Sequence, residues 1–225
     1  MKRAPLGLVV EGRREGFRRV YIPPSFRVDD VAVVYEFLDE HSFATLISVR
    51  DGVPFATHLP LLLDRESGVI LGHFARANPH WEAFGVGAES LAIFHGPHAY
   101  ISPAWYAAAP AVPTWNYAAV HVYGMPRLLA EDRTRAVVDQ TVKKFESKHA
   151  VPWPNELPED FRQKLLRGIV GFEMPIARIE AKFKLGQNRS EADQAGMLTH
   201  LRAGSSDAKL LAEFIMRHHG SGGGA

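Results

Sequence analysis

The stretch Phe43–Asp64, FATLISVRDGVPFATHLPLLLD, decides the fold that this sequence predicts. Two runs of apolar and β-branched residues flank the dipeptide Asp51-Gly52, which supplies the positive φ angles that a tight hairpin turn needs. The pattern therefore predicts a β-hairpin, with FATLISVR as one strand and PFATHLPLLLD as the other.

Four further runs with strand character follow the hairpin along the chain. They are VILGHF (69–74), SLAIFH (90–95), HAYIS (98–102) and WNYAAVHVYG (115–124). The turn Asp64–Gly68 precedes the first of these runs, and a short helix is expected around Trp81–Phe84. Six closely spaced strands with short turns are typical of a small antiparallel barrel.

Helix signals flank this strand-rich region. Asp29 and Asp30 supply N-cap oxygens for a helix that ends near Glu40. Further along, Asp132–His149 carries an amphipathic stripe, and Glu159–Arg167 is expected to form a second helix. Residues of about 130–168 are therefore predicted to be a helical insertion.

The segment after the insertion returns to strand and then to helix. In IVGFEMPIARIEAKFKL (169–185), apolar and charged residues alternate near the end, and Pro175 is expected to introduce a bulge or an edge. Ser190 begins a helix through a capping box with Asp193, and Leu210–Met216 indicates a last helix. The predicted class is α+β, an antiparallel barrel with a helical insertion and C-terminal helices.

The chain is predicted to have three parts. Residues 1–20 hold five arginines, three glycines and no sustained periodicity, which indicates an N-terminal extension that is a short helix or a disordered arm. Residues 21–203 form the main domain. Residues 204–225 form a C-terminal helix followed by a flexible Gly-rich tail.

Composition excludes several classes of protein. The 26 Lys and Arg residues against 25 Asp and Glu give a formal charge of +1, which offers no electrostatic basis for coating nucleic acid or an anionic membrane. The absence of cysteine excludes disulfides, thiolate catalysis and cysteine-ligated zinc or iron–sulfur sites. No apolar run approaches the ~20 residues of a membrane span, and the apolar patch near the N-terminus is too short for a signal peptide. A cytoplasmic protein without a membrane partner is expected.

A dense group of aromatic residues lies in GPHAYISPAWYAAAPAVPTWNYAAVHVYG, residues 96–124. The centre of this segment lacks helical periodicity, and six side chains would suit a flat cleft for a planar ligand, where aromatic faces meet a few polar groups. The six are Tyr100, Ser102, Trp105, Trp115, Asn116 and Tyr117. The alternative is a Pro-kinked pair of strands whose aromatic residues belong to the core.

Two polar segments are candidates for anion binding. In LGHFARANPHW (71–81), Arg76 follows a strand and lies among small residues, where its planar guanidinium suits a phosphate. The alternative there is a solvated arginine before a helix that Asn78 caps. In KFKLGQNR (182–189), Lys184 and other cations precede a capped helix, which favours an anion site. There the alternative is a strand edge that lysines protect.

Five histidines fall on or near the predicted strands, at positions 58, 73, 95, 98 and 121. Their spacings match no chelating pair, so no metal site is predicted and hydrogen-bonded histidines are the first interpretation. A haem protein would need one of them as an axial ligand, and that alternative stays open. The two helices expected within Ser190–His219 also allow a helix-turn-helix interpretation. Their loose connection and the lack of a polar recognition helix make DNA a weakly supported partner.

Several segments together resemble the PaiB family, described as FMN-binding negative transcriptional regulators. They are YIPPSFRVDD (21–30), the hairpin segment 43–64, LGHFARANPHW (71–81), AIFHGPHAYISPAWY (92–106), VPTWNYAAVHVYG (112–124) and IVGFEMPIARIEAKFKLGQNRSEAD (169–193). The resemblance runs in order and spacing from Tyr21 to about Leu201. The family's KLSQNR motif appears as KLGQNR, with Gly186 at the serine position.

The resemblance implies a split β-barrel that forms a homodimer and holds FMN at the subunit interface. It also implies which residues bind the cofactor, and no catalytic residue is predicted. Gly72, His73, Ala75, Arg76 and Asn78 would hold the ribityl-phosphate, Trp115 and Asn116 of the partner subunit would lie near the ring, Thr57, His58 and Leu59 would run along the isoalloxazine, and Lys184 completes the set.

Three functions are compatible with this resemblance. The first is an FMN-binding negative regulator of transcription. The second is a flavin-dependent oxidoreductase that acts on a small substrate, in which the cofactor carries the redox chemistry. The third is a haem-binding split barrel that uses one of the histidines.

Overall fold

The computed structural model describes residues 20–84, 87 and 89–219. Residues 1–19 of the predicted N-terminal extension and residues 220–225 of the predicted tail lie outside the described residues. The helices are α1 (Val31–Glu40), α2 (Glu131–Glu146), α3 (Glu159–Arg167), α4 (Glu191–Ala203) and α5 (Ser206–His219), with the short 3-10 helices η1 (Pro24–Phe26), η2 (Pro79–Ala83) and η3 (Pro103–Trp105). The strands are β1 (Phe43–Arg50), β2 (Val53–Pro60), β3 (Leu62–Asp64), β4 (Val69–Ala75), β5 (Ser90–Ile101), β6 (Thr114–Gly124), β7 (Arg127–Leu128) and β8 (Ile169–Lys184).

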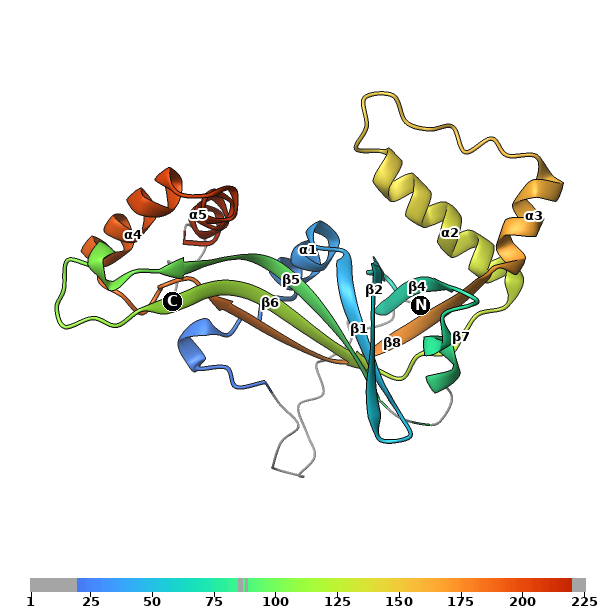
Figure 1. Cartoon of the computed structure of the whole chain (residues 1–225), viewed down its shortest axis with the longest axis horizontal. Coiled ribbons are helices and arrows are strands. Elements are labelled where there is room, and N and C mark those ends of the chain that lie inside the picture. The colour runs from blue at the N-terminus through green and yellow to red at the C-terminus, as the bar shows by residue number, and fades with distance from the viewer. Residues whose placement is uncertain (1–19, 85–86, 88, 220–225) are drawn as a thin grey trace, which may run out of the picture.

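The strands form one antiparallel sheet in the order β2-β1-β5-β6-β8-β4-β3, with β7 beside β8. Figure 1 shows α4 and α5 over the β5–β6 end of this sheet and the α2–α3 insertion beyond the opposite end. The predicted antiparallel architecture, the hairpin β1–β2 and the helix α3 are confirmed. No described helix combines the length and the apolar character that crossing a membrane requires.

Two of the predicted strands have different bounds in the structure. The predicted strand PFATHLPLLLD is divided into β2 and β3, because the chain changes partner after Pro60 and pairs next with β4. The segments SLAIFH and HAYIS, predicted as separate strands, form the single strand β5, in which a register shift between His95 and His98 absorbs Gly96 and Pro97.

The strand β8 joins the two halves of the sheet. Its first half, up to Pro175, pairs with β4, and its second half, from Ile176, pairs with β6. The register with β6 shifts at this change of partner, which confirms the irregularity expected at Pro175. At 16 residues, β8 spans up to about 50 Å when extended.

The core lies between one face of the sheet and the helices α1, α4 and α5. Asp30 is the N-cap of α1, as predicted, and its carboxylate accepts from the backbone N–H of Ala32 at 2.8 Å. Phe37 of α1 meets Phe183 of β8 and Phe214 of α5 with ring centroids 5.1 and 5.9 Å apart. The helix α5 therefore packs into the same core as the residues 21–203, and the division of the chain at residue 204 stays a prediction.

Candidate cofactor site

The side chains of Thr57, Asn78 and His80 are hydrogen-bonded to one another where β2 and η2 meet, and Arg76 lies just after β4, two residues before Asn78. We call these four residues the β4–η2 cluster. Asn78 caps η2, since its Oδ1 accepts from the backbone N–H of His80 at 3.0 Å. The amide nitrogen of Asn78 donates to Thr57 Oγ1 at 3.2 Å. The predicted residues Thr57 and Asn78, far apart in the sequence, are thus in direct contact.

His80 is the buried centre of this cluster. Its side chain is only 1% exposed and stacks on Phe74, with ring centroids 5.1 Å apart. Its Nδ1 lies 2.8 Å from Thr57 Oγ1, and its Nε2 lies 2.9 Å from the hydroxyl of Ser48. Burial lowers the pKa of His80 from 6.5 to about 4, because a charged imidazole is poorly solvated there. The ring is therefore neutral at pH 7.

Arg76 lies at the end of β4, exposed, as predicted, but its guanidinium already has protein partners. The Nε atom donates to the carbonyl of Arg167 at 2.8 Å, and Nη2 donates to the carbonyl of Ile169 at 2.9 Å. These carbonyls belong to the end of α3 and the start of β8, where a cation is favoured by the helix dipole. Nη1 has no protein partner among the described residues, so this nitrogen remains available to an anion.

The other predicted residues of this region divide between core and surface. Leu59 is buried in the core, and a Cβ at Gly72 would meet Phe172 Cζ at 2.7 Å, so Gly72 serves the packing of the core. His73 is half-buried on β4, and desolvation lowers its pKa. His58 points to the opposite face of the sheet, where its Nδ1 lies 2.9 Å from Thr45 Oγ1, and Ala75 is exposed at the strand end. Leu59 and Gly72 can reach a ligand only through their backbones.

A second group of predicted residues lies at the β5–β6 end of the sheet, and we call Tyr100, Trp115 and Lys184 the β6–β8 cluster. Trp115 is 49% exposed and meets the ring of Tyr100 edge-on, with centroids 6.2 Å apart. Lys184 donates to the hydroxyl of Thr114 and, at 3.0 Å, to the carbonyl of Trp115. Desolvation, followed by the nearby cations Lys182 and Arg189, lowers the pKa of Lys184. The group is an exposed aromatic surface beside a cation.

Asn116 does not join this surface. Its side chain is 1% exposed, and its amide nitrogen lies 3.2 Å from Met197 Sδ under α4. Gly186, at the position of the family's serine, has a φ of +88°, and a Cβ there would meet the Met197 side chain at 3.0 Å. Any side chain at this position is therefore strained, which explains why glycine is suited to it.

The two clusters lie at opposite ends of β8. Arg76 is tied to Ile169, the first residue of this strand, whereas Lys184 is its last residue. The strand between them spans up to about 50 Å when extended, and Figure 1 shows β4 and the β5–β6 tip on opposite sides of the molecule. One copy of the chain therefore does not bring all the predicted cofactor residues to one mononucleotide.

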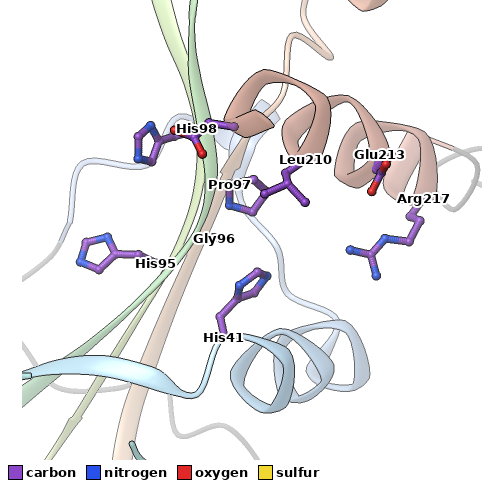
Figure 2. Close-up of a pocket in the computed structure, with 9 residues that line it drawn as sticks. His41, His95, Gly96, Pro97, His98, Leu210, Glu213 and Arg217 are labelled. Atoms are coloured by element: carbon purple, nitrogen blue, oxygen red, sulfur yellow. The ribbon is translucent and has the colours of Figure 1, made fainter. Parts of the chain in front are cut away.

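A separate cavity of about 340 Å³ lies between α1, β5 and α5 (Figure 2). His41 points toward it from the end of α1, and Figure 2 shows the rings of His95 and His98 on the other side of β5. None of the residues predicted to bind FMN lines this cavity. Within the described residues, His, Asp and Glu side chains form no group of three or more that could hold a metal ion.

The sequence interpretation missed three buried residues of the site. His80, Ser48 and Ser90 are 1%, 3% and 3% exposed, and Ser90 Oγ lies 2.7 Å from Ser48 Oγ. The segment Asn78-Pro79 indicated a helix start with His80 in the first turn, but no local pattern indicated that His80 would be buried. The contributions of the two serines come from distant strands and have no local signal.

Comparisons with known proteins agree with this architecture. The chain matches the family model described as "Putative FMN-binding domain" over residues 20–178. It is 38% identical over 201 residues to "Protease synthase and sporulation protein PAI 2" of Bacillus subtilis, which covers 87% of this chain and 96% of that protein. It is 27% identical over 205 residues to an uncharacterized protein of Emericella nidulans, covering 73% of this chain and 82% of that protein.

Two solved structures share the fold at low sequence identity. The flavocytochrome Anf3 from Azotobacter vinelandii has a TM-score of 0.56 and 18% identity, covering 76% of this chain and 75% of that one. The FAD and heme binding protein from Mycobacterium smegmatis has a TM-score of 0.53 and 17% identity, covering 70% and 73%. At such identities the likeness concerns the fold alone, and it confirms the predicted split barrel. Because the family model covers more than half of the chain and PAI 2 aligns along nearly its full length, this chain belongs to the PaiB family of FMN-binding-domain proteins.

Proposed function

We propose that this chain is an FMN-binding, PaiB-type negative regulator of transcription that holds its cofactor between two copies. The observation that carries the proposal is the family match over residues 20–178, which includes every residue predicted to bind FMN except Lys184. The name of the Bacillus subtilis relative, which concerns protease synthesis and sporulation, supports a regulatory role.

The β4–η2 cluster suits a ligand rich in hydrogen-bond acceptors. Arg76 offers Nη1 beside its two carbonyl contacts, and Thr57 lies half-buried at the edge of the same site. Phosphate and flavin carbonyl oxygens are the acceptors that such donors bind, and a guanidinium pairs especially well with phosphate. Bound FMN would supply the electron-accepting ring, while these residues would hold and orient it.

A second copy would explain the separation of the two clusters. The sheet face opposite the core carries a row of directly paired residues, which are His58, Thr45, Ile93, His121 and Glu180. Phe43, on the same face of β1, is 66% exposed. The aromatic residues Tyr100 and Trp115 of the β6–β8 cluster are 48% and 49% exposed. A two-fold related copy is expected to cover this face, and the family resemblance places the cofactor between the two copies. The homodimer is therefore part of the proposal.

Repression by direct reading of DNA is the less favoured route within this proposal. The helix α5 directs Leu211, Phe214 and Ile215 into the core, so it does not stand free as a recognition helix. Its exposed face mixes charges, and Arg217 pairs with Glu40 at 2.9 Å. We expect regulation to depend on a protein partner or on the flavin, with the cytoplasm as the place of action.

The absorption spectrum of the purified protein tests the cofactor directly. Bands at ~370 and ~450 nm, with one FMN released per chain on denaturation, are expected. A Soret band in place of them would favour the haem-binding alternative, and a colourless protein that takes up no added FMN would contradict the proposal. Rapid turnover of a reduced nicotinamide by the flavin-loaded protein would favour the oxidoreductase alternative.

A further inference from the structure

A chain of hydrogen-bonded side chains runs from the core to Thr57. It begins at Ser90 Oγ, passes to Ser48 Oγ at 2.7 Å and to His80 Nε2 at 2.9 Å, and continues from His80 Nδ1 to Thr57 Oγ1 at 2.8 Å. The first three residues are buried, whereas Thr57 is half-buried. This series of hydrogen bonds therefore has one end in the core, at Ser90, and the other at the candidate cofactor site, at Thr57.

The number of protons sets the direction of these bonds. A neutral imidazole donates from one ring nitrogen and accepts at the other, and each hydroxyl has one proton to donate. If Thr57 donated to His80, each bond would point inward, and the proton of Ser90 would have no acceptor among the described residues. A buried donor without an acceptor keeps its full desolvation cost, so this direction is disfavoured. In the opposite direction every buried proton has an acceptor.

Asn78 fills the remaining acceptor position of Thr57. Because Asn78 Oδ1 accepts from the backbone N–H of His80, its amide nitrogen is the atom that faces Thr57 and donates to Oγ1. The Nδ1–H of His80 is the second donor to the same oxygen. A hydroxyl oxygen accepts two hydrogen bonds, so Thr57 has no further acceptor capacity and only its own proton is left.

We propose that the chain Ser90–Ser48–His80 makes Thr57 an obligate hydrogen-bond donor, which selects a ligand that presents an acceptor atom at this point. His80 acts as a positioning residue in the Nδ1–H tautomer, and it reaches the ligand only through Thr57. The identity of the ligand as FMN rests on the proposed function, with a phosphate or carbonyl oxygen as the acceptor. The direction of these hydrogen bonds does not depend on the identity of the ligand.

The tautomer of His80 is measured first, without any cofactor. In a ¹⁵N–¹H correlation spectrum of ¹⁵N-histidine-labelled protein, His80 should show a protonated Nδ1 and an unprotonated Nε2 at neutral pH. The His80→Gln variant assigns the signal by its disappearance. If that variant does not fold, the Thr57→Val variant assigns it by the shift of a single imidazole. A protonated Nε2 would overturn the proposal.

Titration of two threonine variants with FMN then tests the donor role. Thr57→Val should weaken FMN about tenfold or more, since it removes a donor to a charged or polar oxygen. Thr57→Ser should retain most of the affinity, and Thr199→Val, at an exposed position of α4, should equal the parent protein. An unchanged affinity of Thr57→Val would contradict the donor role. A parent protein that binds no FMN would instead contradict the proposed function, and the tautomer would still decide the direction of the chain.

Discussion

The Nδ1 atom of His80 lies 2.8 Å from Oγ1 of Thr57, so a buried imidazole is joined directly to a hydroxyl at the edge of the candidate cofactor site. This contact links the core to strand β2. The family resemblance implies that residues of β2 run along the flavin ring. A change at His80 should therefore affect both the stability of the fold and the binding of the cofactor.

The buried state of His80 should make the protein less stable in mild acid. Its pKa falls from 6.5 to about 4 on folding, so between these values the unfolded chain binds more protons, and stability is lost as the pH falls through this window. The full shift corresponds to about 3 kcal/mol. Urea unfolding at about pH 7 and about pH 5 measures the loss.

Two histidine variants isolate the contribution of His80 from those of the other buried histidines. His80→Gln should reduce the pH dependence of stability, whereas the exposed His149→Gln should keep it. An equal pH dependence in all three proteins would show that His80 is not the group responsible.

Arg76 is expected both to bind the phosphate of FMN and to stabilise the fold through its hydrogen bonds to two carbonyls. Arg76→Ala should weaken FMN by roughly 2–4 kcal/mol, because a charge-assisted contact to phosphate is lost. It should also lower stability, since the carbonyls of Arg167 and Ile169 lose their donor. Arg76→Lys should be intermediate in affinity. Arg65→Ala, which removes an exposed arginine paired with Asp39, is the matched control. Reduced stability with an unchanged FMN affinity would assign Arg76 to structure alone.

Gly72 should tolerate no side chain, for a reason that concerns the core. In Gly72→Ala the new methyl group would meet Phe172 Cζ at 2.7 Å and Leu61 Cδ2 at 2.8 Å, and overpacking of this kind costs about 1–3 kcal/mol. Gly168→Ala, where the nearest atom is Leu165 O at 3.2 Å, should cost less. Urea unfolding compares the two, and a stability of Gly72→Ala equal to the parent would refute the packing role.

The sheet face opposite the core, which carries His58, Ile93 and His121, should be a dimer interface. Light scattering at micromolar concentration is expected to give twice the 25.0 kDa chain mass, with an interface above ~2,000 Å² of total buried surface. Ile93→Asp, in the middle of this face, should dissociate the dimer, whereas Val151→Asp, at an 87% exposed position elsewhere, should not. A monomeric parent protein would refute the interface.

Binding to DNA should be weak and without marked sequence preference. A specific reader neutralises several phosphates, so its affinity falls about 10³-fold or more between about 50 and 200 mM salt. The chain has 26 basic against 25 acidic residues and no described basic recognition helix, so no such binding is expected. Gel shifts on upstream DNA at ~150 mM salt measure it. A nanomolar complex that resists non-specific competitor DNA would favour direct repression.

The sequence by itself determined the elements that local rules specify. The cap at Asp30, the turn at Asp51-Gly52 and the cap by the Ser190 hydroxyl lie where predicted, because each depends on neighbours in the chain. The predicted capping box is only half formed, since the Asp193 carboxylate accepts from the backbone N–H groups of Ala107 and Ala108. The family also followed from sequence, since its motifs are contiguous segments. Arg76 and Asn78 were placed correctly at a strand end for the same reason.

Only the tertiary structure decided which of these residues meet. The first half of β8 pairs with β4 and the second half with β6, which separates Arg76 from Lys184. No local sequence pattern indicates that these two residues lie at opposite ends of the same strand. His80 of η2 contacts Ser48 of β1 and Thr57 of β2, so these contacts exist only after the two strands have paired and η2 has packed against them. Local propensity acts over a few residues along the chain, whereas burial and hydrogen-bond partners depend on contacts between distant segments.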